Sequence, residues 1–149
     1  MIKRIYPEDP VTLEQLYRLQ QASYPFEAEI IGYEKLPPLL ETKLQLKECG
    51  ESFYGYYEND RLAGILSYQL KDQILDICRV AVHPDYFRKG IAGALLEKVL
   101  LSSNYIKAIV CTGQKNLPAV QLYRKHGFQK IKDIEIADGI YLTEFELTR

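Results

Sequence analysis

The sequence predicts one compact α/β unit without internal repeats, and two observations carry this prediction. Apolar runs separated by the turn-forming pairs Asn59-Asp60 and Lys71-Asp72 indicate an antiparallel meander in the middle of the chain. Beyond the meander, a strand, a glycine-containing turn, a helix and a further strand indicate a strand-helix-strand unit, whose crossover is expected to be right-handed. A final hairpin is expected to follow.

Four helices are expected from apolar spacing and from residues that begin or end helices. Leu13, Leu16 and Tyr17 recur at helical spacing, and so do the apolar residues that follow Gly90. Proline is typical of the first turn of a helix, and glycine is typical of the position after its end. The expected helices are Thr12 to Ala22, Pro37 and Pro38 toward Cys49 with an end at Gly50, Ile91 to Leu100, and Asn116 to Gly127.

Seven strands are expected where apolar segments lie between turn-forming residues. Asp138-Gly139, between the last two segments, is a strong signal for a type I′ hairpin turn. The expected strands are Ile2 to Tyr6, Phe53 to Glu58, Arg61 to Leu70, Gln73 to Val82, Ile106 to Thr112, Lys130 to Ile136 and Ile140 to Leu147.

Composition excludes several classes of protein. The chain has 149 residues, of which 47% are hydrophobic, and its formal charge of −1 gives no global attraction to nucleic acid or to anionic lipid. Cys49, Cys78 and Cys111 are an odd number without a CxxC pair, so neither a disulfide framework nor a metal site is indicated. No apolar stretch approaches the roughly 18 residues that span a membrane. We therefore expect a cytoplasmic protein with reduced thiols.

A basic, glycine-containing turn joins the fourth expected strand to the third expected helix. Its glycines fall at the first turn of that helix, where main-chain N–H groups lack partners and the helix dipole is positive, so a pyrophosphate could bind there. An ordinary basic turn is the alternative interpretation. The order Lys89-Gly90 does not match a P-loop, and the GxGxxG spacing of a dinucleotide fold is absent. The residues of this turn are Arg88, Lys89, Gly90, Ile91, Ala92 and Gly93.

A second motif follows one strand later and makes the pattern specific. Together with Gly90 and Ala92, it resembles the GNAT superfamily of acyl-CoA-dependent N-acyltransferases, whose pattern Q/RxxGxG/A precedes NxxAxxLYxxxGF. Phe87 departs from this pattern, because it occupies the place of the leading Gln or Arg. The second motif matches at Asn116, Ala119, Leu122, Tyr123, Gly127 and Phe128.

The resemblance implies a fold and a cosubstrate. The fold is a mixed, mostly antiparallel sheet of about seven strands with helices on both faces and a splayed pair of parallel central strands. Residues 1–149 would form a single N-acetyltransferase domain that uses acetyl-CoA, requires no metal and acetylates an amine. Neither nucleic acid nor a membrane is an expected partner, and the sequence leaves a homodimer open.

The resemblance also assigns roles to individual residues. Main-chain groups of Val80, Ala81 and Val82 would pair with the pantetheine arm and stabilise the oxyanion. Tyr123 matches the general acid, since a phenol with a pKa of about 10 stays protonated at neutral pH and can donate to the leaving thiolate. Asn116 is expected both to cap its helix and to contact the cofactor.

The general base is less clear. Asp76 lies four residues before Val80, which predicts the same face of the strand, and it matches the glutamate of the histone-acetylating branch. A salt bridge, for example to Arg79, is the alternative interpretation for Asp76. The branch that acetylates ribosomal proteins places its glutamate where this chain has Cys111, and a thiol is a poor substitute.

The acceptor would bind to the segment between the first two helices, where acidic and aromatic residues could attract and pack a cationic amine. A solvated loop is the alternative there. A non-catalytic acyl-CoA-binding regulatory domain is the alternative function, and a nucleotide-binding module is a third interpretation. The acceptor candidates in this segment are Tyr24, Phe26, Glu27, Glu29, Tyr33 and Glu34, and Tyr54 and Tyr68 are further candidates on the strands.

Overall fold

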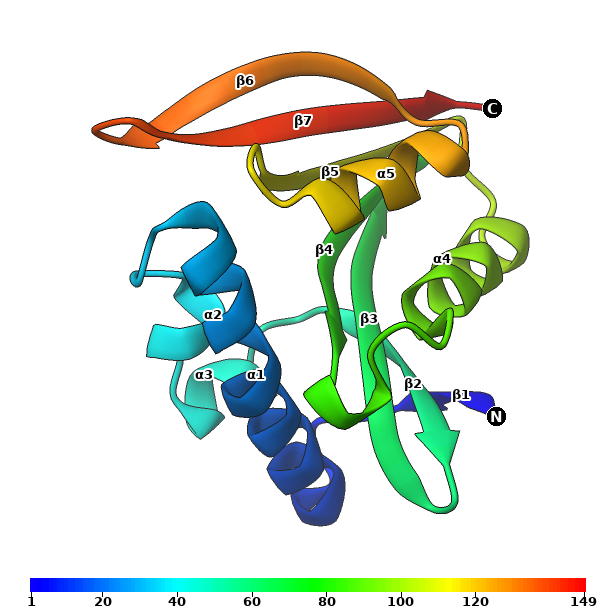
Figure 1. Ribbon diagram of the computed structural model, residues 1–149. Coiled ribbons are helices and arrows are strands. Elements are labelled where there is room, and N and C mark those ends of the chain that lie inside the picture. The colour runs from blue at the N-terminus through cyan, green and yellow to red at the C-terminus, as the bar shows by residue number, and fades with distance from the viewer.

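A seven-stranded sheet in the order β1-β2-β3-β4-β5-β7-β6 forms the centre of the computed structural model, which describes residues 1–149 (Figure 1). Every neighbouring pair of strands is antiparallel except β4 and β5, which confirms the predicted mixed sheet. The strands are β1 (Ile2–Ile5), β2 (Ser52–Glu58), β3 (Arg61–Lys71), β4 (Ile74–Val82), β5 (Lys107–Gly113), β6 (Gln129–Ala137) and β7 (Ile140–Thr148).

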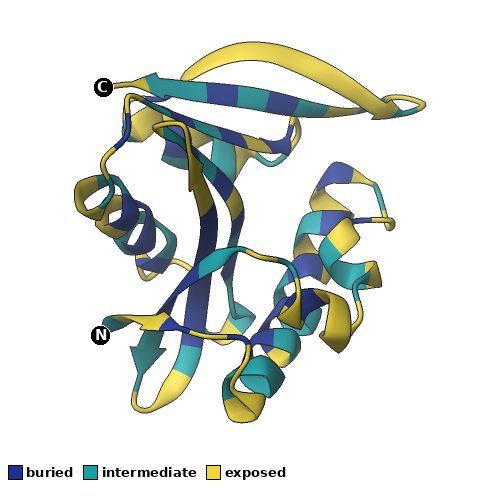
Figure 2. Cartoon of the chain, turned by 180° about the vertical axis from the view of Figure 1, so that it is seen from behind, coloured by how far each residue is buried: buried dark blue, intermediate teal, exposed yellow.

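Helices cover both faces of the sheet. On one face α1 (Pro10–Ile31), α2 (Pro37–Leu40) and α3 (Lys43–Lys47) enclose a core that includes Leu16 and Phe53. On the other face α4 (Ile91–Ser102) and α5 (Leu117–Lys125) enclose a second core that includes Leu95 and Phe145. Figure 2 shows buried residues on the inner sides of these helices and along the central strands, whereas β6 is exposed along most of its length. No helix is both long enough and apolar enough to cross a bilayer.

The first two helical predictions need correction. The first helix does not end at Ala22 but continues to Ile31, because its buried stripe continues through Tyr24 and Ala28. Gly32 then ends it with a left-handed φ of 73°. The expected helix from Pro37 toward Cys49 is two short helices instead. Thr42 begins the second of them with a reciprocal capping box, in which Thr42 and Gln45 bond each other's main-chain N–H groups.

One of the three predicted hairpin turns is confirmed, and the other two need correction. Asn59 and Asp60 both have positive φ angles, 50° and 65°, as a two-residue primed turn requires. The next turn is at Asp72-Gln73, one residue later than expected, and it also has two positive φ angles. At Asp138-Gly139 only the glycine has a positive φ, so the type I′ prediction is wrong. A register shift between Glu135 and Ala137 accompanies that turn.

The two parallel strands part halfway along their length, as predicted. β4 and β5 are paired only from Ile74 to Ile77, opposite Lys107 to Val110. Beyond this point β4 remains paired with β3, and β5 remains paired with β7. The sheet therefore opens between its two central strands, and Figure 1 shows α5 lying beside this opening.

Candidate active site

A cleft of about 870 Å³ occupies the opening between β4 and β5. Helices from both faces of the sheet reach it, because the strands that elsewhere separate the two faces have parted. α1 contributes one side, the start of α4 and the inner face of α5 contribute the other, and β4 and β5 form the floor. The cleft therefore joins residues that are far apart in the sequence.

The main chain of Val80 and Val82 faces this cleft. Hydrogen-bonded pairs alternate along antiparallel strands, and the His83 N–H donates to the Ala63 carbonyl at 2.8 Å. The next residue of β4 bonded to β3 is therefore Ala81, and the N–H and C=O groups on either side of it point toward the gap that β5 has left. This edge of β4 is free to accept one more extended chain.

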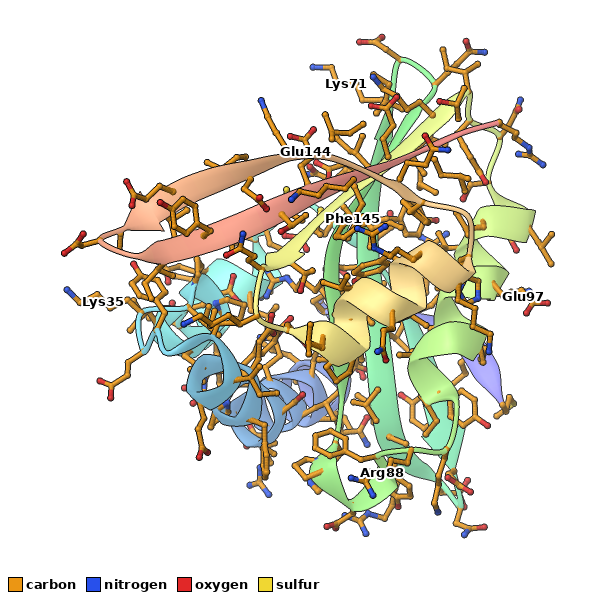
Figure 3. The ribbon with its side chains drawn as sticks, turned by 45° about the horizontal axis from the view of Figure 1, so that its top comes forward. Lys35, Lys71, Arg88, Glu97, Glu144 and Phe145 are labelled. Carbon is orange, nitrogen blue, oxygen red and sulfur yellow. The ribbon has the colours of Figure 1, made fainter.

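The loop before α4 carries a run of unpaired main-chain donors. None of the six N–H groups from Arg88 to Gly93 donates to an acceptor within the protein, and the first helical bond is from Ala94 to the Gly90 carbonyl. Gly90 is the N-cap, with a φ of 74° and no side-chain cap. Figure 3 shows the Arg88 side chain at this loop. An anion bound here would meet both free amides and positive charge.

Phe87, which replaces the polar residue of the motif, links this loop to α1. Its ring meets the ring of Phe26 edge to face, with centroids 5.4 Å apart and an interplanar angle of 86°. Both residues line the cleft. This hydrophobic contact joins the loop before α4 to α1, at a position where the motif has a polar side chain.

Tyr123 lies on the inner face of α5 with only 4% of its surface exposed. Asn116 caps this helix as predicted, because its Oδ1 accepts from the Ala119 N–H at 3.3 Å. The Tyr123 ring packs at 5.7 Å from the ring of Phe128 and at 6.0 Å from that of Phe145. Burial raises the pKa of Tyr123, so the phenol is protonated at neutral pH. Its hydroxyl is not sealed inside the core, and the residue lines the cleft.

Glu27 and Tyr24 face this tyrosine from α1. They are one helical turn apart, so both lie on the side of the helix that lines the cleft. Burial raises the pKa of the Glu27 carboxyl, and the Asn116 amide opposes part of that shift. The charge of Glu27 also raises the pKa values of Tyr24 and Tyr123, and all three side chains line the same cleft. Sequence reasoning placed Glu27 in a loop and gave it no role beyond attraction of the amine.

Of the other acceptor candidates, only one lines the cleft. Phe26 lines the cleft, but Glu29 and Glu34 are exposed outside it, and Tyr33 does not line it. The two strand tyrosines are also outside the cleft. The rings of these residues, Tyr54 and Tyr68, stack on each other in the core with centroids 5.9 Å apart. Neither residue lines the cleft, so neither is an acceptor residue of this cleft.

The predicted placement of Asp76 is wrong. Cys78 is an extra residue in β4, because Ile77 pairs with Tyr68 and the next pair is Arg79 with Ser67. Such a bulge reverses the alternation of side chains, so Asp76 and Val80 face opposite sides of the sheet. Asp76 does not line the cleft. Its pKa is raised, chiefly by burial, and no ion pair holds it, so the alternative of a salt bridge to Arg79 is also wrong.

Arg79 instead joins two carboxylates on the α1 side of the cleft. Its guanidinium bonds Glu41 at 2.6 and 2.8 Å and Glu51 at 2.8 and 3.1 Å, and it reaches Gln20 of α1 at 2.9 Å. Ser67 also donates to Glu51 at 2.6 Å. The side chain of Arg79 is only 7% exposed, so this network fixes α1 and the α2–α3 connection to β4. Sequence reasoning missed it, because its members lie on five separate segments.

The remaining polar candidate, Cys111, lines the cleft as a free thiol. Burial and the nearby carboxylates of Glu144 and Asp76 raise its pKa. A thiol in such surroundings is neither an effective base nor an activated nucleophile.

Comparison with known proteins agrees with the cleft and its motifs. A model described as "Acetyltransferase (GNAT) family" matches residues 13–128. The chain therefore belongs to the acetyltransferase (GNAT) family, and the predicted family is confirmed.

Individual relatives cover the chain to different extents. It is 38% identical over 148 residues to the UPF0157 protein YqkA of Bacillus subtilis, a match that covers 99% of this chain and 43% of that protein. It therefore spans less than half the length of that relative.

Solved structures share the fold. The ribosomal-protein-S18-alanine N-acetyltransferase of Escherichia coli superimposes with a TM-score of 0.78 at 18% identity, over 99% of this chain and 92% of that one. The PaiA N-acetyltransferase of Thermoplasma acidophilum, solved in complex with coenzyme A, gives a TM-score of 0.76 at 19% identity, over 97% and 96%. At these identities the likeness concerns the fold, and the predicted GNAT fold is confirmed.

Proposed function

We propose that residues 1–149 form a single N-acetyltransferase domain that transfers an acetyl group from acetyl-CoA to a primary amine, by direct attack in a ternary complex. One observation carries the proposal. Six consecutive unpaired N–H groups, from Arg88 to Gly93, open onto the same cleft as a buried tyrosine, Tyr123. Main-chain donors at a helix N-terminus suit a pyrophosphate, and a protonated phenol suits a leaving thiolate.

The cofactor would be bound mainly by the main chain. Amides of the loop and the charges of Arg88 and Lys89 would bind its phosphates. The pantetheine arm would lie along the free edge of β4 as an added strand, bonded to Val80 and Val82. Ala81 would not take part through its own polar groups, since they face β3. An N–H of the same edge would stabilise the oxyanion of the tetrahedral intermediate.

Tyr123 would protonate the thiolate of coenzyme A as it leaves. The burial that raises the pKa of the phenol also acts on a thiolate in the same cleft. Two thiols that line the cleft, Cys111 and Cys78, also have raised pKa values, about 12 for Cys78, through partial desolvation and nearby carboxylates. The proton affinities of donor and acceptor therefore rise together, and proton transfer stays feasible.

The acceptor is proposed to be a cationic amine, either a small molecule or an amine of a protein or peptide. Three carboxylates line the α1 side of the cleft, Glu27, Glu41 and Glu51, whereas Arg79 is the one cation among them. The net negative charge attracts a protonated amine. Asp76, outside the cleft, remains a second candidate for the base, acting through water.

A screen for thiol release from acetyl-CoA, run against a varied amine library, tests this function. We expect turnover with at least one amine, and coenzyme A binding by calorimetry. Binding without acetylation of any amine would favour the alternative, a non-catalytic acyl-CoA-binding regulatory domain, to which the absence of a glutamate at Cys111 points. Absence of both would contradict the proposal.

Cellular setting and assembly are part of the proposal too. We propose a cytoplasmic location, as expected from the cysteine pattern. A homodimer is also retained, because β6 is an exposed edge strand of the sheet and its outer main-chain groups are free to pair. Light scattering of the purified protein would measure its oligomeric state.

A further inference from the structure

We propose that Glu27 is the general base that takes the proton of the acceptor amine, and that the hydroxyl of Tyr24 holds the amine beside it. This inference rests on the proposed function and goes beyond it, because it assigns the acceptor subsite to one turn of α1. The family motifs in the sequence do not include either residue.

Position within the cleft is the first argument. Tyr123, the proposed acid, lies on the α5 side, so a base for the incoming amine has to reach the same thioester from elsewhere. The opening between β4 and β5 is where a residue of α1 can do so. Glu27 faces this opening, and its charge influences the pKa of Tyr123 directly. Acid and base would thus reach the reacting carbon from opposite faces of the sheet.

The second argument is that both side chains are free to bind a ligand. Tyr24 is 6% exposed, its hydroxyl forms no hydrogen bond within the protein but is not sealed from the cleft, and the residue lines the cleft. Glu27 is partly buried without a cation, and the neutral Asn116 amide offsets only part of its desolvation. A free phenol and a carboxylate without a cation on one helical turn could together bind a ligand that donates hydrogen bonds and carries positive charge. A protonated amine would do so.

The other carboxylates are less suitable as the base. The carboxylates of Glu41 and Glu51 are already paired with the Arg79 guanidinium, so they are less free to take a proton from the acceptor amine. Asp76 lies outside the cleft because of the bulge at Cys78. Glu27 alone combines an open position in the cleft with a carboxyl whose pKa is raised toward neutrality.

In the proposed reaction the acetyl group moves from sulfur to nitrogen and one proton is released to solvent. The ammonium form of the acceptor gives one proton to the Glu27 carboxylate, and the neutral nitrogen attacks the thioester carbon. The C–N bond forms, the C–S bond breaks, and the sulfur takes the proton of Tyr123. The second proton of the nitrogen returns to Tyr123 through water, and Glu27 releases its proton to solvent. The products are the acetylamide, coenzyme A as the thiol, and one proton.

Glu27→Gln tests the base, and Glu29→Gln is the matched control. The control removes the same charge from an exposed position of the same helix, outside the cleft. We expect Glu27→Gln to lower kcat at neutral pH by roughly 100-fold or more, with unchanged affinity for coenzyme A. Its residual rate should rise steadily with pH, because the amine then loses its proton to solvent. Glu29→Gln should retain the wild-type rate and pH profile.

To assign the acidic limb of the pH profile to Glu27, the other titratable groups near it have to be considered. The other titratable groups of the cleft that surround this turn are Tyr24 on the same helix, Tyr123 on α5, Cys111 on β5, and Glu41 and Glu51 paired with Arg79. Arg79 stays charged throughout, and both tyrosines have raised pKa values, so the acidic limb of the kcat/KM profile should report Glu27. That limb should disappear in Glu27→Gln.

Tyr24→Phe tests the holding role. We expect KM for the amine to rise several-fold with a smaller change in kcat, because only the hydroxyl is lost and the ring still packs. Thermal melting of each variant shows whether it is folded.

Distinct results separate the two proposals. If Glu27→Gln folds and keeps the wild-type kcat while Asp76→Asn loses it, the assignment of the base is wrong although the protein is an acetyltransferase. If the wild-type protein acetylates no amine, the proposed function itself fails.

Discussion

The two sides of the cleft would bind their ligands in different ways. On the α4–α5 side the groups offered are main-chain amides around Gly90 and one phenol, Tyr123. On the α1–α3 side they are charged side chains, with Glu41 and Glu51 bonded to a buried arginine. Main-chain binding leaves a readable motif, because it needs glycines and helix caps at fixed spacing. Side-chain binding leaves no such motif, because its members come from separate segments. The difference explains why the sequence located the residues of the α4–α5 side more readily than those of the α1–α3 side.

Gly90→Val should have the largest effect on the cofactor side. The glycine has a φ of 74°, a conformation that strongly disfavours a β-branched residue, so the free amides behind it would be displaced. We expect coenzyme A binding to be lost in calorimetry. Gly139→Val is the matched control, because Gly139 has a φ of 73° and open space around it but lies in the β6–β7 turn. Retained binding by Gly90→Val would contradict main-chain recognition at this loop.

Tyr123→Phe should separate chemistry from binding on the same side. Loss of the phenol proton should lower kcat by roughly 100- to 1,000-fold, which is within the range for general acids, while the Kd for coenzyme A changes little. Steady-state kinetics and calorimetry on one preparation would measure both. Tyr105→Phe is the control, since Tyr105 is buried in the same core but outside the cleft. Equal effects of the two substitutions would leave Tyr123 with a packing role only.

Arg79→Ala should lower the stability of the protein, because the charge network of Arg79 holds the α1–α3 side of the cleft together. Removal of the guanidinium leaves Glu41 and Glu51 without their partner in a largely buried place, which costs about 3–5 kcal/mol of unfolding free energy. Urea denaturation would measure the loss. Arg18→Ala is the control, because Arg18 pairs with Glu14 at 2.7 Å on the surface, with 79% of its side chain exposed, and should cost less than about 1 kcal/mol. Similar losses for both variants would mean that the buried network adds little.

Phe87→Arg should have the smallest effect, and it probes the contact between the two sides. It restores the polar residue of the motif beside the phosphate loop but removes the edge-to-face contact with Phe26. We expect coenzyme A to bind a few-fold more tightly, since one charge-assisted hydrogen bond is added, and melting to occur slightly earlier. Phe26→Leu removes the same aromatic contact without adding charge. Equal coenzyme A affinity in the two variants would show that position 87 does not face the phosphates.

Local chemistry accounts for what could be predicted of this fold. Alternating apolar segments and turn pairs located all seven strands, and the two motifs located the loop of unpaired amides before α4 and the capped α5 helix. The type of turn at Asp138-Gly139 could not be predicted from the two residues alone, because it depends on the register of the flanking strands. Similarly, Pro25 did not end α1, since buried residues beyond it continue the helix against the sheet.

The sequence by itself determined the family and the order of the strands along the chain. It also determined the residues that shape the main chain locally, namely the glycine loop before α4 and the Asn116 cap of α5. Only the tertiary structure decided which side chains meet in the cleft. One extra residue in β4, Cys78, turned Asp76 away from Val80, and one extended helix brought Glu27 opposite Tyr123. The physical reason is that motifs record interactions between residues close in the chain, whereas the parting of β4 from β5 brings together side chains from opposite faces of a sheet.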